Sequence, residues 1–184
     1  MTLSVALLRG INVGGRNAIR MPALKAALEA DGFERVATYI QSGNVIFAPP
    51  ATSSAELTTR IEALLEVSFG FPVPVVVRTH TQMRTVVARA PSGFGEDPAT
   101  FRSDVIFLKE PLTAKTAIAS VPTNPDVDEV HQGPGVLYFS RLVAEATRSR
   151  LNKIVASPIY PNVTIRNWNT TTRLLAMLDN ASRR

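Results

Sequence analysis

The sequence contains no cysteine and only two histidines, His80 and His131. Without cysteine the chain can form no disulfide, thiolate nucleophile, iron–sulfur cluster or zinc site with cysteine ligands. The two histidines are far apart in the chain and neither lies within a cluster of carboxylates, so the sequence predicts no metal site, with only an Asp/Glu magnesium site left open. We expect both imidazoles to be surface or hydrogen-bonded side chains.

Long hydrophobic runs are also missing. No stretch approaches the roughly 18 consecutive apolar residues that span a bilayer, and the N-terminus lacks the basic and apolar segments of a secretion signal. With 184 residues, 45% of them hydrophobic and 19% charged, the chain is long enough for one medium domain or two small ones. We therefore expect a soluble, cytoplasmic protein with no membrane partner, present as a monomer or a homodimer.

The chain has no recognisable catalytic motif. A G-x-S-x-G elbow is absent, and a catalytic triad cannot be built from two distant histidines without cysteine. The glycine-rich segment near the N-terminus matches neither G-x-x-x-x-G-K-[ST] nor G-x-G-x-x-G, which disfavours a Walker-type NTPase and a dinucleotide-binding fold. The sequence therefore identifies no nucleophile and no catalytic residue, and it leaves any cofactor unknown.

The pattern of apolar residues predicts two successive βαββαβ halves. In the first half we expect strands at residues 3–9, 34–40, 44–47 and 73–78, and helices at 21–30 and after the capping-box residues Ser53 and Glu56. In the second half we expect strands at 104–109, 127–131, 136–140 and 163–166, and helices at 113–120, 148–156 and 170–178. This order of elements is that of the ferredoxin-like fold, also called the α/β plait.

We therefore predict an α+β protein of two tandem ferredoxin-like halves, residues 1–78 and 101–184, joined by a connecting helix and loop over 79–100. The second half carries an added C-terminal helix. Several strands are apolar at successive positions, as at 105–108, and such runs are typical of strands buried on both faces. Because a ferredoxin-like sheet has helices on only one face, we expect the other half or a second chain to cover the second face.

Residues 9–17 place three glycines, two arginines and two asparagines between the first strand and the first helix. Glycine lets the main chain approach a ligand, and arginine offers forked donors to phosphate or carboxylate. In a βαββαβ half, the end of the first strand and the turn after the second lie at one edge, so this loop should meet residues 41–44. We predict that a small anionic or nucleotide-like ligand binds there, at Arg9, Asn12, Gly14, Gly15, Arg16, Gln41, Ser42 and Asn44.

The same loop also suits a purely structural role. Gly14 and Gly15 would then only permit a turn, and Asn12 and Asn17 would bond to main-chain groups. The arginines would pair with surface acids, and residues 41–44 would be just a hairpin.

The second candidate site is formed by Arg166, Asn167, Trp168 and Asn169, which precede the last helix. Trp168 is the only tryptophan and could stack on a base or a sugar, although packing is the commoner role of such a residue. Asn169 or Thr170 is expected to cap the helix.

Positive charge gathers at the end of the chain. Residues 148–184 contain one acid and seven basic residues, Arg148, Arg150, Lys153, Arg166, Arg173, Arg183 and Arg184. Such a segment can bind nucleic acid without sequence preference, with an affinity that falls steeply with salt, but it is also typical of a solvated helix face. The stacking aromatics of ferredoxin-like RNA-binding modules are largely missing. A third alternative is an enzyme of unknown reaction, in which arginine and amide donors stabilise developing negative charge.

Three segments resemble the bacterial family called domain of unknown function 1697. They are residues 8–15 (LRGINVGG), 38–47 (TYIQSGNVIF) and 166–170 (RNWNT). Arg16 stands where the family pattern is expected to have lysine, a conservative departure. The resemblance spans nearly the whole chain and implies an architecture related to tandem α/β plaits, in agreement with the two halves. It implies that the three segments are shared features of the family, and it implies no activity or catalytic residue.

Overall fold

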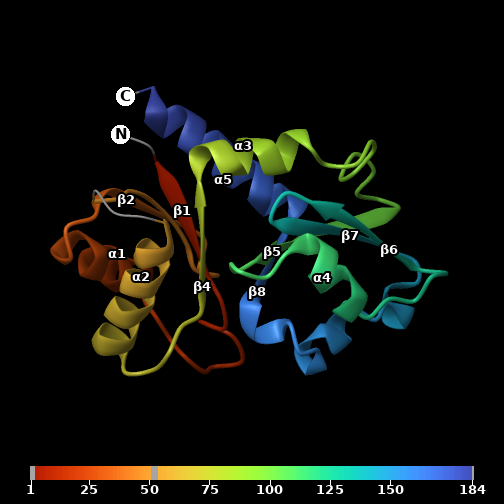
Figure 1. The fold of residues 1–184 in the computed structure, drawn as a ribbon, viewed down its shortest axis with the longest axis horizontal. Helices are drawn as coiled ribbons and strands as arrows, with labels where there is room; N and C mark the ends of the chain where they lie inside the picture. Colours follow the sequence, from red (N-terminus) through yellow and green to blue (C-terminus); the bar gives the residue numbers. More distant parts are fainter. Residues whose placement is uncertain (1–2, 51–53, 184) are drawn as a thin grey trace. The chain divides into compact units, whose positions relative to one another are not determined.

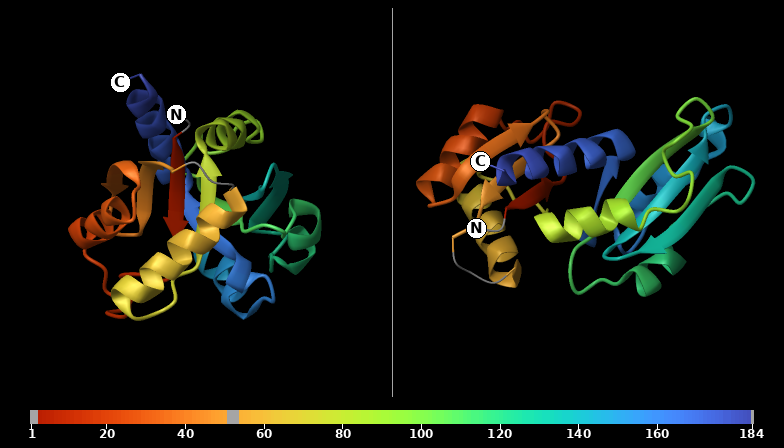
Figure 2. Two further views of the ribbon diagram at one scale, coloured as in Figure 1. Left: turned by 60° about the vertical axis from the view of Figure 1, so that its left-hand side comes forward. Right: turned by 90° about the horizontal axis from the view of Figure 1, so that it is seen from above.

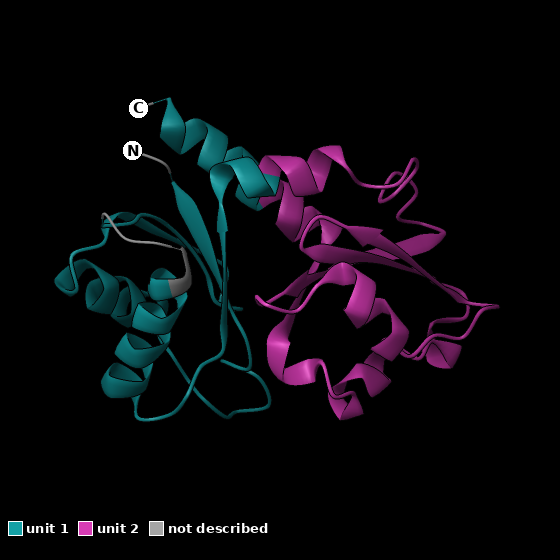
Figure 3. Cartoon of the chain, in the orientation of Figure 1, with its two compact units in different colours: residues 1–83, 174–184 teal, residues 84–173 magenta. Residues whose placement is uncertain are grey.

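The computed structural model describes residues 3–50 and 54–183 of the chain. The chain divides into two compact units, one of residues 1–83 with 174–184 and the other of residues 84–173 (Figure 1, Figure 3). Each unit contains one four-stranded antiparallel sheet and a hydrophobic core of its own. The protein is therefore an α+β protein.

The first unit contains β1 (Ser4–Leu8), α1 (Met21–Ala30), β2 (Glu34–Tyr39), β3 (Asn44–Ala48), α2 (Ser54–Phe69) and β4 (Val75–Thr79). Its sheet has the order β2-β3-β1-β4, and every neighbouring pair is antiparallel. Figure 2 shows α1 and α2 together on one face of this sheet. There, alternate strand residues such as Ala6, Leu8 and Phe47 pack with Leu24 of α1 and Ile61 of α2.

The elements of the first unit begin and end close to the predicted residues. Pro22 lies in the first turn of α1, and Leu24 and Leu28, one turn apart, form its buried stripe. The predicted helix cap Ser53 lies outside the described residues, while Glu56 lies in the first turn of α2.

Both faces of the first sheet are buried along its central strands, β1 and β3. Helix α5 (Trp168–Ser182) belongs to the first unit from Leu174 onward. There His80 Nε2 lies 2.7 Å from Asp179 Oδ1, and the guanidinium of Arg35 donates to the carbonyl of Ala181. These contacts attach the C-terminal part of α5 to the first unit.

The second unit contains most of α3 (His80–Ala88), β5 (Phe101–Leu108), α4 (Ala114–Ala117), β6 (Asp128–Gly133), β7 (Val136–Leu142) and β8 (Val163–Asn167). Its sheet has the order β6-β7-β5-β8, again antiparallel throughout. Ile106, Leu137 and Phe139 pack on one face with Ala117 of α4. On the opposite face the Tyr138 hydroxyl donates to the Val86 carbonyl of α3 at 2.6 Å, and burial raises the pKa of Tyr138 to about 12.

The predicted α-helix over 148–156 is wrong. Three short 3₁₀ helices, Ala146–Arg148, Leu151–Ala156 and Tyr160–Asn162, occupy this region. The buried residues Leu151 and Ile154 are three positions apart, which matches the three-residue turn of a 3₁₀ helix. Prolines at positions 158 and 161 prevent a regular α-helix from continuing. Across the described residues, no helix has both the length and the hydropathy to cross a bilayer.

A buried ion pair lies in the second unit, between Asp104 of β5 and Arg141 of β7. Arg141 Nη2 lies 3.5 Å from Asp104 Oδ2, and both side chains are largely buried. Burial raises the pKa of the Asp104 carboxyl, although the positive charges of Arg141 and Arg102 act in the opposite direction. The desolvation of the carboxylate therefore outweighs the attraction of the two guanidinium groups.

The turn between β2 and β3 requires a glycine at position 43. Gly43 has a φ of +81°, and a Cβ there would lie 2.7 Å from Leu8 Cβ and 2.8 Å from Ile11 Cδ1. Gly10 has a φ of +74°, with no atom within 4 Å of such a Cβ. We expect Gly43→Ala to lower the free energy of unfolding by about 3 kcal/mol and Gly10→Ala by about 1 kcal/mol, because only the first adds a clash to the backbone cost. Urea unfolding measures both, and equal losses would contradict the clash.

The raised pKa of Asp104 makes the stability of the protein depend on pH. A carboxyl whose folded-state pKa is raised contributes stability that is present at low pH and is lost as the pH rises through that pKa. Asp104→Asn removes this titration, so the variant does not lose this contribution as the pH rises. The unfolding free energy of the variant minus that of the wild type should therefore be more positive at about pH 7 than at about pH 3. Urea unfolding at both pH values measures the difference.

Asp97 provides a matched control for Asp104. Hydrogen bonds from the hydroxyl and the main-chain N–H of Thr100 lower the pKa of the exposed Asp97 carboxyl. The same substitution, Asp97→Asn, should therefore shift the difference in the opposite direction as the pH rises. If both variants shifted in the same direction, the sign assigned to Asp104 would be wrong.

Candidate functional site

The glycine-rich loop and the β2–β3 turn meet at one edge of the first unit. Asn12 Nδ2 donates to the carbonyl of Gln41 at 2.8 Å, and the main-chain N–H of Leu8 donates to the carbonyl of Gly43 at 2.8 Å. The two predicted segments are therefore in direct contact.

The asparagines of this loop bond to the main chain. Asn12 Oδ1 accepts from the N–H of Ile19 at 2.8 Å, and its Nδ2 also donates to the Ile19 carbonyl at 2.9 Å. Asn17 Nδ2 donates to the carbonyl of Gly10 at 3.0 Å. Both asparagines have a positive φ, 54° for Asn12 and 51° for Asn17. Their carboxamides fix the shape of the loop, which is the structural role considered for them in the sequence.

The remaining residues predicted for this edge differ in exposure. Asn44 is fully buried and donates to the Tyr39 carbonyl and the Ser42 hydroxyl, both at 3.0 Å. Arg9 is partly exposed, and the exposed members of the set are Gly14, Gly15, Arg16, Gln41 and Ser42. Asn44 therefore supports the turn from within, and the exposed groups of the edge are main chain, guanidinium, amide and hydroxyl.

The second predicted segment, residues 166–169, divides between two environments. Arg166 is buried and donates to the Thr164 hydroxyl and the Ile165 carbonyl, both at 2.9 Å. Burial lowers the pKa of Arg166 to about 10. The next three residues, 167–169, line a hollow, and Arg166 does not. Arg166 is therefore a buried structural residue of β8.

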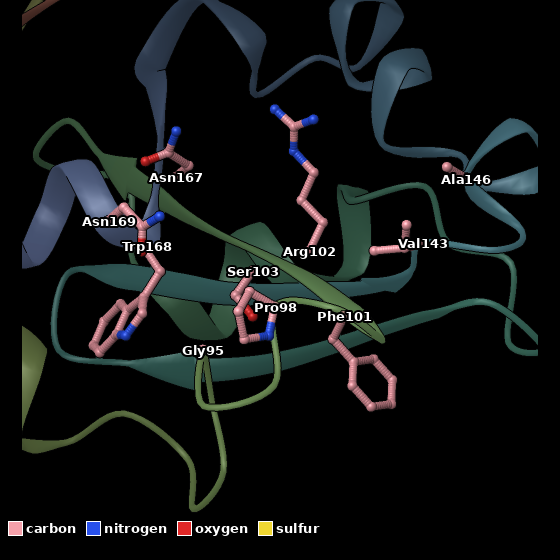
Figure 4. Close-up of a pocket in the computed structure, with 10 residues that line it drawn as sticks. All are labelled: Gly95, Pro98, Phe101, Arg102, Ser103, Val143, Ala146, Asn167, Trp168 and Asn169. Atoms are coloured by element: carbon pink, nitrogen blue, oxygen red, sulfur yellow. The ribbon is translucent and has the colours of Figure 1, made fainter.

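The hollow has a volume of about 380 Å³ and lies where β8 gives way to α5 (Figure 4). Asn167 pairs with Asp104, which is the last register pair of β8 with β5. Residues 101–103 of β5 extend beyond that pair and border the hollow, with the side chain of Arg102 on the opposite face of the strand from those of Phe101 and Ser103 (Figure 4). The space therefore exists because β8 is shorter than the strand beside it.

Trp168 is held between the hollow and the loop before β5. The ring of Phe94 contacts the indole edge to face, with centroids 5.1 Å apart and an interplanar angle of 85°. A Cβ on Gly95 would lie 2.0 Å from Trp168 Cδ1, so only glycine lets the loop backbone pack on the indole. Trp168 therefore packs within the second unit, as the commoner role predicts, and its side chain also lines the hollow.

Asn167 caps α5, and the prediction of Asn169 or Thr170 as the cap is wrong. Asn167 Oδ1 accepts from the main-chain N–H of Thr170 at 2.7 Å, and the helix begins at Trp168. The positive end of the α5 dipole consequently lies at the hollow.

Arg102 supplies a full positive charge to the same hollow. It is exposed, and Figure 4 shows its side chain extending from β5 on the same side as Asn167. No local sequence pattern identifies Arg102, because only the register of β5 with β8 brings it close to the start of α5. The hollow thus combines a guanidinium, an indole and the carboxamides of Asn167 and Asn169.

Comparison with known proteins identifies relatives of the chain but no activity. None of the curated proteins compared with the chain matches it. A solved structure described as "conserved bacterial protein SP0830 from Streptococcus pneumoniae" is similar over 96% of this chain and 98% of that chain, with 27% sequence identity and a TM-score of 0.82. A family model matches residues 1–138, which include the first two segments of the resemblance described above and not the third. The chain belongs to the family described as "Protein of unknown function (DUF1697)".

Proposed function

We propose that the protein binds a small anionic or nucleotide-like ligand and that the hollow beside Trp168 is the binding site. The observation that carries this proposal is that the only tryptophan and the exposed guanidinium of Arg102 line the same hollow. An indole packs well against a base or a sugar, and a guanidinium pairs with phosphate or carboxylate. The volume of the hollow, about 380 Å³, is in the range of small-molecule sites.

The fluorescence of Trp168 provides a direct test, because the chain has no other tryptophan. We expect guanosine or adenosine 5′-monophosphate to change the emission with a saturating curve. Arg102→Ala should weaken the apparent affinity about tenfold, since one charge-assisted hydrogen bond contributes about 1.4 kcal/mol. Lys115→Ala removes an exposed cation of α4 outside the hollow and should bind like the wild type. No emission change and no heat of binding at millimolar nucleotide would overturn the proposal.

A second proposal places an anion at the edge formed by residues 9–17 and 41–44. Gly14 and Gly15 have positive φ, and no atom lies within 4 Å of where their Cβ atoms would be, so the main chain beside Arg16 is open. The observation in its favour is this exposed backbone next to an exposed guanidinium. The hollow beside Trp168 is favoured over this edge because the loop asparagines already bond to the main chain.

The edge is tested by thermal unfolding in phosphate. Phosphate should raise the melting temperature of the wild type, and Arg16→Ala should abolish most of the increase. Lys25→Ala, which removes an exposed cation of α1, should leave it unchanged. An increase that survives Arg16→Ala would place the anion elsewhere.

Sequence-independent nucleic-acid binding has less support. Arg166 is buried, and Arg148 pairs with Asp126 and Glu145 at 3.4 and 3.3 Å. These contacts reduce the charge that the C-terminal region offers to phosphates. Oligonucleotide binding that falls steeply with salt would restore this alternative.

We also propose that each unit is a ferredoxin-like α/β plait. In both sheets the first strand of the unit lies between the third and the fourth, and the second is at the edge. In the first unit α1 and α2 connect the strands on one face. In the second unit α4 and short 3₁₀ helices take the corresponding places in the chain order.

A further inference from the structure

A second hollow, of about 330 Å³, adjoins the one beside Trp168 and shares Phe101 and Ser103 with it. Its other walls include Phe94 from the loop before β5, Glu129 and His131 of β6, and Ser140 of β7. Both hollows belong entirely to the second unit.

The register of the sheet places the polar residues of the two hollows in one row. Glu129 of β6 pairs with Ser140 of β7, which pairs with Ser103 of β5. Trp168 follows Asn167, the last residue that pairs with β5, so it continues the row beyond Ser103. With neighbouring strands about 4.8 Å apart, the row extends about 14 Å from Glu129 to Trp168, comparable to an extended mononucleotide.

Ser103 lies in the middle of this row, where the two hollows join. It is 7% exposed, and its hydroxyl is buried without a hydrogen-bond partner among the residues that the structure describes. Buried polar groups are normally paired, so an unpaired hydroxyl that borders both hollows indicates that a bound group supplies the partner.

The far end of the row offers hydrogen-bond acceptors. His131 Nε2 lies 2.7 Å from Glu129 Oε1, and both side chains are exposed. When the neutral imidazole donates from Nε2 to this carboxylate, Nδ1 is left as an acceptor, and the carboxylate keeps lone pairs of its own. Acceptors side by side suit a base edge that presents N–H donors. Guanine presents two adjacent donors, N1–H and N2–H₂, whereas N1 of adenine is an acceptor and would be repelled.

We propose that the two hollows form one extended site for a guanine nucleotide. The guanine edge bonds to Glu129 and His131, and the sugar packs on Trp168 beside Ser103. The phosphate passes the open edge of β5, where no strand follows Asn167, and reaches the start of α5 and Arg102, whose side chain leaves β5 on the opposite face. This inference rests on the proposed function, because it specifies which ligand the hollow beside Trp168 binds. It adds that the base, and not only the phosphate, determines affinity.

Isothermal titration calorimetry of the full chain with guanosine, inosine and adenosine 5′-monophosphates tests the proposal. The wild type should bind the guanosine compound at least about tenfold more tightly than the adenosine compound, with the inosine compound between them, since a charged hydrogen-bond pair is worth about one factor of ten. This comparison requires no variant, so it cannot fail through misfolding.

Variants then show which residues cause the preference for guanosine over adenosine monophosphate. Glu129→Gln should bring the ratio of guanosine to adenosine affinities close to one, because a carboxamide offers both a donor and an acceptor. Gln132→Ala changes an exposed residue of the same strand that lines neither hollow and should keep the wild-type ratio. Arg102→Ala should weaken both nucleotides equally and leave the ratio unchanged.

The outcomes separate this inference from the proposed function. If both nucleotides bind equally and Glu129→Gln changes neither, the guanine site is wrong while the binding hollow stands. If no nucleotide binds and the emission of Trp168 does not change, both are wrong. Tighter binding of adenosine than guanosine monophosphate would overturn the inference directly.

Discussion

The ladder between β5 and β8 ends at the pair of Asp104 and Asn167, and the geometry of the second unit's candidate site depends on this end point. The strand ends at Asn167, because the Asn167 side chain accepts the N–H of Thr170 and the following residues form α5. Trp168 is thereby turned out of the sheet and into contact with Phe94 and Gly95. Residues 101–103 are left without a neighbouring strand on that side, and the hollow occupies the freed space. One side-chain cap therefore ends a strand, starts a helix and opens a cavity.

In the first unit, asparagine carboxamides also bond to the main chain, but there they close a loop and do not begin a helix. Asn12 and Asn17 close the glycine-rich loop on the main chain of Ile19, Gln41 and Gly10. Two asparagines with positive φ are held in place by these bonds, which offset the cost of an unusual backbone. Such a loop has a fixed shape without a ligand. In sequence, an asparagine that closes a loop and an asparagine that binds a ligand look alike, since both occur in glycine-rich loops.

More of the fold than of the candidate site could be predicted from the sequence. Alternating apolar residues and turn glycines predict the strands within a few residues, because burial acts locally on each element. The α-helix predicted over 148–156 is wrong, because residues 151 and 154 fit a helical period and only the later prolines show that the turns are tighter. The second hollow could not be predicted from the sequence. Glu129, Ser140 and Ser103 come from three strands, and no local pattern states which residues of different strands face one another.

The distinction between structural and ligand-binding polar groups follows from how much hydrogen-bonding capacity each retains. Asn44 and Arg166 are buried, and their donors already reach main-chain carbonyls and hydroxyls of the same unit. Replacing such a group removes a bond that the fold itself uses, so its loss registers as stability. Arg102 is exposed, whereas the hydroxyl of Ser103 is buried without a partner among the described residues. Groups of this kind gain most from a ligand, because the hydrogen bonds that they form with it replace bonds to water in the case of Arg102 and fill a missing bond in the case of Ser103. Arg102 and Ser103, two residues of the hollow that no sequence pattern identifies, therefore keep hydrogen-bonding capacity for a ligand.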